Sequence, residues 1–253
     1  MINYKTVGNE PNRSWLVMIH GAGGSIETWY RQVPELSRHF NLLLVDLAGH
    51  GNSEISPDTS ELSFEVMADQ VIEVLDYLKI EKCHFMALSI GCIVSQVIAD
   101  HYPQRIKKMV MAGSITAMTF RTKVIIYLTD RFKRVFPRSF ITWMLVTAIL
   151  PQKKSNRVWM KSAEQVSNKS FLLWLSVISK MEELLAGLFN RKCQIPTLYL
   201  MGKRDILFLS SVKRIAKRNK EYAKLIVVPK AGHACNIDNK RFFNQASIEY
   251  LLA

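Results

Sequence analysis

One serine in the chain has the sequence surroundings of a catalytic nucleophile. Ser89 follows a short apolar run, and the residues two positions before and after it, Ala87 and Gly91, are small. A sharp strand-to-helix turn that exposes a serine tolerates only small side chains at those positions. The turn also places the serine at a helix N-terminus, where free N–H groups stabilise a developing oxyanion. The pattern predicts a nucleophile elbow at Ser89, with the backbone N–H of Ile90 as one oxyanion donor.

Two further residues could activate this serine. A serine hydroxyl is a weak nucleophile unless a histidine accepts its proton and a carboxylate fixes that histidine's tautomer. His233 and Asp205 each come just beyond an apolar run of strand length. The other place for the acid, after the apolar run 108–112, offers no carboxylate before Asp130. We therefore predict Ser89 as nucleophile, His233 as general base and Asp205 as the acid that orients it.

The elements that must position these residues alternate along the chain. Short apolar runs, typical of buried strands, are separated by segments with helical periodicity. This alternation predicts an α/β fold, a mostly parallel sheet flanked by helices on both faces. The expected strands are residues 15–19, 41–46, 83–88, 108–112, 197–201 and 225–229, and the expected helices include 25–38, 61–79 and 238–252.

One long segment breaks the alternation. From Ala117 to Cys193 the sequence has apolar residues at helical spacing and no strand candidate. Ligands of parallel sheets bind beyond the carboxyl ends of the strands, so an insertion there is expected to cover the site as a cap. The predicted organisation is a core of residues 1–116 and 194–253 with an inserted helical cap of residues 117–193.

Five motifs in chain order resemble those of the α/β-hydrolase family, in particular its small capped serine hydrolases of the esterase and thioesterase kind. They are HGAGG at 20–24, DLAGHGNS at 46–53, ALSIG at 87–91, GKRD at 202–205 and GH at 232–233. The resemblance extends from about Ile2 to Leu252. It implies an α/β-hydrolase fold, a catalytic triad that cleaves an ester or thioester through an acyl-enzyme on Ser89, no cofactor, and a second oxyanion donor at Ala22.

Other activities of similar proteins remain open at this point. One is a lyase resembling the menaquinone-pathway synthase, although that family usually has an arginine shortly after the nucleophile, where this chain has Ile93, Val94 and Ser95. A cofactor-free perhydrolase and a non-enzymatic signalling homologue are the other two. Haloalkane dehalogenases and epoxide hydrolases resemble the chain only in fold, because its nucleophile is a serine.

Composition restricts the class of protein. With 49% hydrophobic and 22% charged residues, the 253-residue chain is expected to fold as a globular protein. Its longest apolar stretches, 140–150 and 171–178, are shorter than the ~20 residues that span a bilayer, so no transmembrane segment is expected. The four cysteines lack metal-ligand spacing. They predict reduced thiols in a cytoplasmic protein without a metal site.

Positive charge is concentrated on the expected cap. The chain has a net charge of +13, and residues 117–193 contain 14 Lys and Arg against 4 Asp and Glu. The densest cluster is Arg131, Lys133, Arg134 and Arg138. It is either a solvated face or a surface that attracts an anionic substrate, a membrane or an acidic partner protein. Nucleic acid is not expected, since no nucleic-acid-binding motif accompanies the charge.

The remaining candidates are aromatic and polar residues near the expected site. Trp143, Trp159 and Trp174 of the cap either line a substrate pocket or pack in the interior, and we predict them as substrate-binding residues for an apolar acyl group. Asp46 and His50 belong to a glycine-rich turn, so a structural role is expected for both. The expected substrate is a small-molecule ester or thioester.

Overall fold

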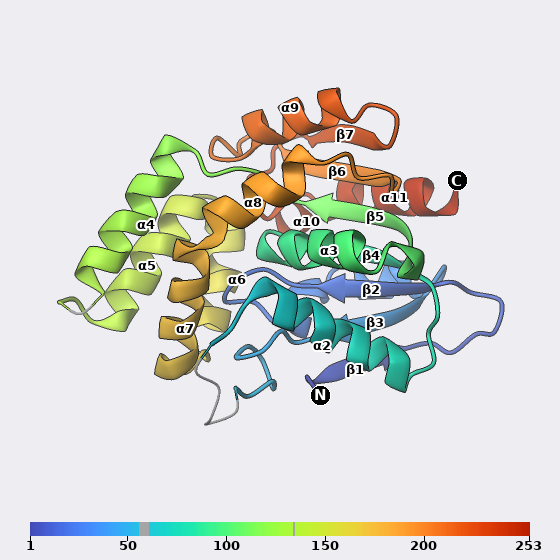
Figure 1. Cartoon of the computed structure of the whole chain (residues 1–253), viewed down its shortest axis with the longest axis horizontal. Coiled ribbons are helices and arrows are strands. Elements are labelled where there is room, and N and C mark those ends of the chain that lie inside the picture. The colour runs from blue at the N-terminus through green and yellow to red at the C-terminus, as the bar shows by residue number, and fades with distance from the viewer. Residues whose placement is uncertain (56–60, 134) are drawn as a thin grey trace.

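The sheet has the order β1-β3-β2-β4-β5-β6-β7, and of the strands in the described residues only β1 runs antiparallel to its neighbour (Figure 1). The computed structural model describes residues 1–55, 61–133 and 135–253. The mostly parallel sheet predicted from the sequence is confirmed. Its strands are β1 (Tyr4–Val7), β2 (Trp15–Ile19), β3 (Asn41–Val45), β4 (Cys83–Leu88), β5 (Ile106–Ala112), β6 (Thr197–Gly202) and β7 (Ala223–Val228).

Both faces of the sheet are buried. Side chains alternate between the faces of a strand, so along β2 Val17 and Ile19 join one core cluster while Leu16 and Met18 join the other. Helices cover the two clusters on opposite sides (Figure 1). The first side carries α2 (Phe64–Tyr77), α3 (Ile90–His101), α8 (Met181–Asn190) and α9 (Leu209–Arg218), and the second carries η1 (Ile26–Trp29), α1 (Val33–Leu36), α10 (Cys235–Asp238) and α11 (Lys240–Leu252). A short helix η2 (Pro103–Arg105) precedes β5.

The described residues between β5 and β6 form five helices. Four of them, which we call the cap, lie beyond the carboxyl ends of the strands (Figure 1). These are α4 (Phe120–Phe132), α5 (Arg138–Ile149), α6 (Lys153–Ala163) and α7 (Asn168–Ser179). The fifth, α8, instead packs against α3 through residues such as Leu185 and Phe189. The expected cap segment 117–193 therefore includes one helix that covers the sheet.

Two local expectations differ from the structure. The expected helix at 25–38 is two short helices, η1 and α1, and Pro34 lies in the first turn of α1. Proline has no N–H to donate, so an unbroken helix through Pro34 would lose a backbone hydrogen bond. The strand β1 has no counterpart among the expected strands. It is a short edge strand with no fully buried residue, and its sequence therefore lacks a buried-strand pattern.

Candidate active site

Ser89 lies where β4 ends and α3 begins. Its φ of 56° and ψ of −118° place it in a sparsely populated backbone region, which marks a strained turn. The turn is tight: a side chain at Gly91 would bring Cβ within 2.6 Å of the carbonyl oxygens of Ile19 and His20. The Ser89 N–H donates to the carbonyl of Ala112 on β5 at 3.0 Å. The local geometry is therefore that of the elbow expected from the sequence.

The three residues selected as nucleophile, base and acid lie together. His233 Nε2 is 2.9 Å from Ser89 Oγ, and His233 Nδ1 is 2.8 Å from Asp205 Oδ2. Asp205 and His233 are each 4% exposed. The Oδ1 atom of Asp205 accepts the backbone N–H of Phe208 at 3.2 Å, which fixes the carboxylate. The three residues follow β4, β6 and β7, so the parallel sheet brings them to one edge.

The loop that carries His233 is held by contacts that the sequence analysis missed. The Gly232 N–H donates to Asp238 Oδ2 at 2.8 Å, and burial raises the pKa of the Asp238 carboxyl. On the other side, a Cβ at Gly113, whose φ is +50°, would lie 2.4 Å from the His233 carbonyl oxygen. A glycine followed six residues later by an aspartate is too common a pattern to have indicated this contact.

The two expected oxyanion donors, Ala22 and Ile90, both line the cavity beside Ser89. The Ala22 loop is fixed from two sides. Trp159 Nε1 donates to the Ala22 carbonyl, and the Gly23 N–H donates to His50 Nε2 at 2.8 Å. These bonds position the loop before any substrate arrives, as preorganised oxyanion stabilisation requires.

His50 and its neighbour His20 are held in the neutral form. The Leu47 N–H donates to His20 Nε2 at 3.0 Å, so His20 Nδ1 carries the proton and donates to the Gly21 carbonyl at 2.8 Å. Burial, together with the neighbouring His20, lowers the pKa of His50 to about 3. Burial likewise lowers the pKa of His20. Two neutral imidazoles therefore brace the Ala22 loop: His50 accepts the Gly23 N–H, and His20 donates to the Gly21 carbonyl.

Asp46 also has a structural position. Its carboxylate accepts the backbone N–H of Ile26 at 2.7 Å, the side-chain N–H of Asn3 at 2.7 Å and the backbone N–H of Asn52 at 3.0 Å. These bonds join the start of η1, the N-terminal segment and the glycine-rich turn. Asp46 is 2% exposed and is not among the residues lining the cavity described below.

The neutral histidines lead to a prediction about acid stability. The unfolded chain binds a proton at His50 below about pH 6.5, whereas the folded protein binds it only near pH 3. The unfolding free energy should therefore decrease as the pH falls through that window, by about 1.4 kcal/mol per pH unit for this residue. Urea unfolding at a series of pH values measures the slope. His50→Gln keeps an acceptor for the Gly23 N–H but does not titrate, so an unchanged slope in this variant would contradict the assignment.

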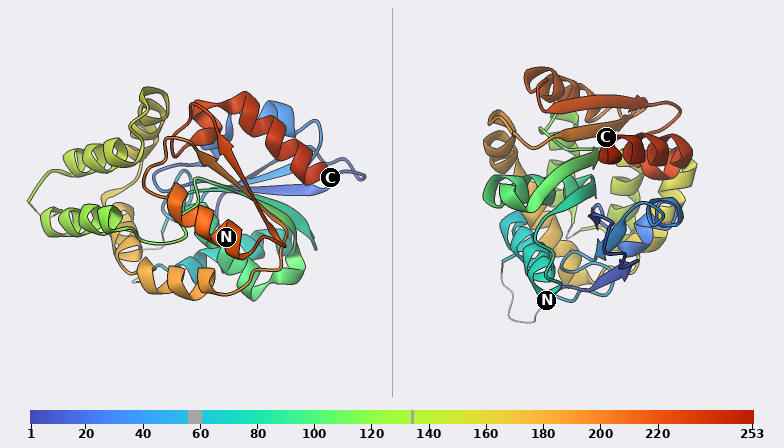
Figure 2. Two further views of the ribbon diagram at one scale, coloured as in Figure 1. Left: turned by 90° about the horizontal axis from the view of Figure 1, so that it is seen from above. Right: turned by 90° about the vertical axis from the view of Figure 1, so that its right-hand side faces the viewer.

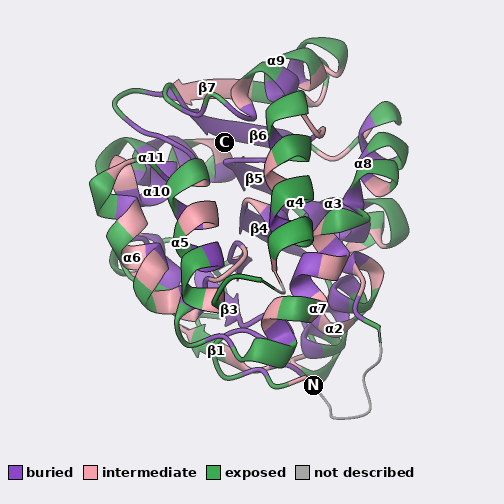
Figure 3. Cartoon of the chain, turned by 90° about the vertical axis from the view of Figure 1, so that its left-hand side faces the viewer, coloured by how far each residue is buried: buried purple, intermediate pink, exposed green. Residues whose placement is uncertain are grey.

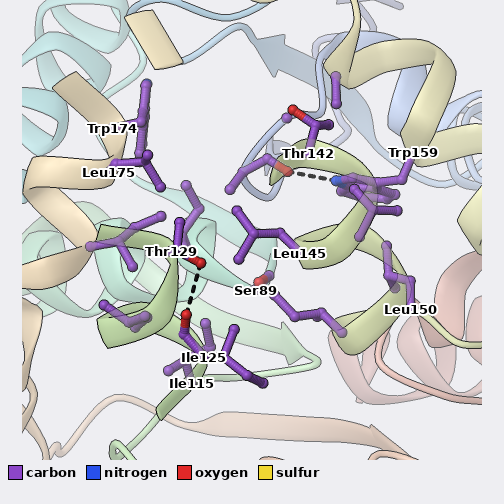
Figure 4. A pocket seen from close by; sticks show the side chains of 18 of the residues that line it. Ser89, Ile115, Ile125, Thr129, Thr142, Leu145, Leu150, Trp159, Trp174 and Leu175 are labelled. Carbon is purple, nitrogen blue, oxygen red and sulfur yellow. Dashed lines mark hydrogen bonds between the residues drawn. The ribbon is translucent and has the colours of Figure 1, made fainter. Parts of the chain in front are cut away.

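A cavity of about 180 Å³ lies between Ser89 and the cap (Figure 4). Three cap helices each turn one face toward it, with lining residues at the spacing i, i+3, i+4, i+7 that defines a helix face. These residues are Thr122, Ile125, Ile126 and Thr129 of α4, Thr142, Leu145, Val146 and Ile149 of α5, and Phe171, Trp174, Leu175 and Ile178 of α7. Most of the lining is apolar. The Thr122 hydroxyl donates to the Thr119 carbonyl and the Thr129 hydroxyl to the Ile125 carbonyl, both at 2.8 Å, so they offer little polarity to a ligand.

The three cap tryptophans have different positions. Trp159 and Trp174 line the cavity, and Trp174 also donates from Nε1 to the Ala48 carbonyl at 2.9 Å. Trp143 is 52% exposed and does not line the cavity, so its selection as a pocket residue is corrected. Because α5 is apolar on nearly all sides, its sequence did not distinguish the cavity face from the outer face.

Two members of the basic cluster on the cap form contacts within the protein. Arg138 donates to the Asn168 side chain and to the carbonyls of Ala163 and Glu164, and it lies over the ring of Phe171. Lys133 pairs with Asp130, while Arg131 is exposed. Arg134 lies outside the residues that the structure describes. The cluster is therefore not a uniform solvated surface.

The cysteines are unpaired thiols, and most of them are buried. Cys83, Cys92 and Cys235 are buried, and Cys193 is half-buried. Burial raises the pKa of the thiols of Cys92 and Cys235, which opposes thiolate chemistry near the site. Within the described ranges, no group of three or more His, Cys, Asp or Glu side chains is placed to hold a metal ion.

Comparison with known proteins identifies the family. The family model of the alpha/beta hydrolase fold matches residues 14–240. The chain belongs to the α/β hydrolase family. A protein of Stutzerimonas stutzeri (strain A1501), named as carbamate hydrolase RutD, is 24% identical to this hydrolase over 96% of the chain and 93% of its own length. The uncharacterized carboxylesterase nap of Bacillus subtilis (strain 168) is 22% identical, over 94% and 79%. The enol-lactonase of Burkholderia xenovorans LB400 shares the fold, with a TM-score of 0.82, 20% identity and coverage of 100% and 96%.

Proposed function

We propose that this α/β hydrolase is a serine hydrolase that cleaves a carboxylic ester or thioester through an acyl-enzyme on Ser89. The observation that carries the proposal is the hydrogen-bonded chain from Ser89 Oγ through His233 to Asp205, with distances of 2.9 and 2.8 Å. A hydroxyl, an imidazole and a buried carboxylate in this order form the arrangement that activates serine nucleophiles. The names of two relatives, a carboxylesterase and a lactonase, also support ester cleavage.

In the proposed reaction, Ser89 Oγ attacks the substrate carbonyl carbon while its proton passes to His233 Nε2. Asp205 accepts the Nδ1–H and stabilises the imidazolium that forms. The oxyanion accepts hydrogen bonds from the backbone N–H groups of Ile90 and Ala22, and loss of one such donor typically costs about 3 kcal/mol. The tetrahedral intermediate then expels an alcohol or thiol, which takes the proton from His233. Water attacks the acyl-enzyme by the same route and releases the acid.

The cavity supports an apolar acyl group. Its lining on α4 extends from Thr122 to Asp130, and the eight helical steps between these residues span roughly 12 Å. Aliphatic side chains from α5 and α7 complete the wall, so a flexible hydrocarbon chain would exclude water from apolar surface there. A small-molecule ester or thioester with an unbranched acyl chain is therefore the proposed substrate class. The unpaired cysteines support a cytoplasmic location for the enzyme.

Covalent labelling tests the proposed nucleophile. A fluorophosphonate is expected to add one label per folded protein, and peptide mapping by mass spectrometry should place it on Ser89. Ser89→Ala should not be labelled. Ser95→Ala is the matched control, because Ser95 is a buried serine of α3 outside the cavity lining, and it should be labelled like the unmodified protein.

Two results would contradict this assignment. Label that persists in Ser89→Ala would place the reactive group elsewhere. A folded protein that takes no label would favour the non-enzymatic homologue, because an activated serine beside an open cavity should react.

A further inference from the structure

The outer surface of the α4–α5 hairpin exposes an unusual amount of apolar side chain. Of the 17 exposed large hydrophobic residues in the described part of the chain, nine lie between residues 120 and 143. We call these nine residues the hairpin patch: Phe120, Val124, Tyr127, Leu128, Phe132, Val135, Phe136, Phe140 and Trp143. The helix α4 therefore has apolar residues both on the side that lines the cavity and among its exposed positions. Figure 3 shows the exposed stretches of this helix.

Four aromatic rings form a continuous row within the hairpin patch. The ring centroids of Phe132 and Phe136 are 5.8 Å apart, those of Phe136 and Phe140 4.9 Å, and those of Phe140 and Trp143 5.9 Å. The row passes from the end of α4 across the connection to the start of α5. The adjoining ends of α4 and α5 project far from the sheet, as Figure 2 shows. Exposed apolar surface on this scale marks an interaction site.

Positive charge accompanies these rings. Residues 117–150 contain six Lys and Arg and a single acidic residue, Asp130. Three of the six are engaged, since Lys123 pairs with Glu182, Lys133 pairs with Asp130 and Arg138 is bound within the cap. Arg121 and Arg131 are exposed and form no ion pair with any residue that the structure describes. The surface thus combines aromatic rings with available guanidinium groups.

We propose that the hairpin patch docks the enzyme onto an anionic lipid surface. Aromatic side chains are favourable at the boundary between headgroups and acyl chains, and adjacent Lys and Arg attract anionic lipids. A second copy of this chain fits the patch poorly, because it would bring two surfaces of equal positive charge together. An acidic protein would need a hollow shaped to a projecting hairpin, whereas a bilayer deforms around it. None of the helices in the described ranges is long and apolar enough to cross a membrane.

Docking would also place the cavity beside the lipid. The cavity lining on α4 reaches Asp130, and the next two residues, Arg131 and Phe132, belong to the outer surface. The outer end of the apolar cavity would therefore face the acyl region of the membrane. This consequence rests on the proposed function, since it makes a lipid-borne acyl ester the natural substrate. The docking itself does not depend on catalysis.

Vesicle binding tests the proposal directly. Ser89→Ala protein is used so that no lipid is consumed, and co-sedimentation compares phosphatidylcholine vesicles with vesicles that also contain phosphatidylglycerol. Binding is expected only with the anionic vesicles and should weaken as salt is added, because the Debye length falls from about 10 Å at 0.1 M to about 3 Å at 1 M. Tryptophan emission should shift to the blue on binding, and Trp143→Phe should remove most of the shift. Trp29, Trp159 and Trp174 are already buried, and the half-buried Trp15 begins β2, at the end of the strand away from the cap.

Two test variants, each with a matched control and each built on Ser89→Ala, separate the contribution of charge to vesicle binding from that of apolar insertion. Arg121→Glu with Arg131→Glu should lower the partition coefficient by roughly 25-fold or more, at about fivefold for each basic residue lost. The charge-matched control is Lys213→Glu with Lys217→Glu on α9, whose side chains are exposed away from the cap. Phe136→Ser, Phe140→Ser and Trp143→Ser together should lower binding at least tenfold. The apolar control combines Tyr77→Ser, Phe242→Ser and Leu252→Ser, three exposed residues outside the cap.

Several results would overturn the proposal. These are equal binding to both kinds of vesicle, no binding to either, and equal losses in the patch variants and their controls. A dimer that dissociates in the aromatic variant would make the patch an interface between copies, and capture by an acidic protein without vesicle binding would make it a protein-docking site. Hydrolysis of a water-soluble ester is measured separately, so failure of the proposed function is distinguishable from failure of docking.

Discussion

Replacing Ser89 with alanine is expected to lower kcat for a cleaved ester by about 10⁶-fold, and replacing His233 with alanine should have a similar effect. Ser89 Oγ and His233 Nε2 lie 2.9 Å apart and would act as one unit. The double variant should therefore be no slower than either single variant, because the remaining rate comes from binding and the oxyanion donors. Initial rates with a p-nitrophenyl ester measure the loss, and circular dichroism verifies the fold.

Asp205 and Asp238 allow a matched comparison between two carboxylates beside the histidine. Asp205→Asn should cost about 10⁴-fold in kcat, because an amide does not hold the His233 Nδ1–H in the required tautomer. Asp238 also supports the histidine loop, but it bonds the Gly232 N–H and does not contact the imidazole. Asp238→Asn should therefore cost only about fivefold, the value of one hydrogen bond. A larger loss in Asp238→Asn than in Asp205→Asn would show that the acid is wrongly assigned.

The second large effect concerns acyl length. Each buried methylene contributes about 0.8 kcal/mol, which corresponds to nearly fourfold in kcat/KM. From acetate to octanoate the gain should accumulate to roughly 10³-fold if the added carbons enter the cavity above Ser89. A series of p-nitrophenyl esters of increasing chain length measures the profile. A flat profile would mean that the cavity does not receive the acyl group.

A cavity-filling variant controls this prediction. Leu145 lies on the cavity face of α5, so Leu145→Trp should block long chains while sparing acetate. Trp143 lies two residues earlier on the same helix and is exposed, so Trp143→Leu should leave the length profile unchanged. If Leu145→Trp slows all esters by the same factor, its effect is on folding or on the triad rather than on acyl length.

The positions of Ser89, Asp205 and His233 could be predicted because each belongs to a short motif at the end of a strand. The requirement is local: Gly91 must be small because carbonyl oxygens lie within 2.6 Å of any Cβ placed there. The order of the strands then brings the three loops to one edge of the sheet. Predicting these three residues therefore did not require any knowledge of the structure of the cap.

The supporting contacts could not be predicted, because they join residues far apart in the chain. His50 accepts the Gly23 N–H and Trp159 donates to the Ala22 carbonyl, yet 27 and 137 positions separate these pairs. The spacing of apolar residues in the cap also did not indicate which side of a helix faces the cavity. In α5, apolar residues occur on both the cavity face and the outer face, so Trp143 was assigned to the wrong one.

The neighbouring positions of β5 and β6 affect when the site is assembled during folding. Residues 113–196 separate these two paired strands, whereas β2, β3 and β4 are joined by shorter connections. Contacts of large sequence separation form slowly, because a long loop must close before they are made. Asp205 and His233 follow β6 and β7, so we expect them to reach Ser89 late. A nascent chain would then carry the elbow without its base, and its serine would stay unreactive until the last strands dock.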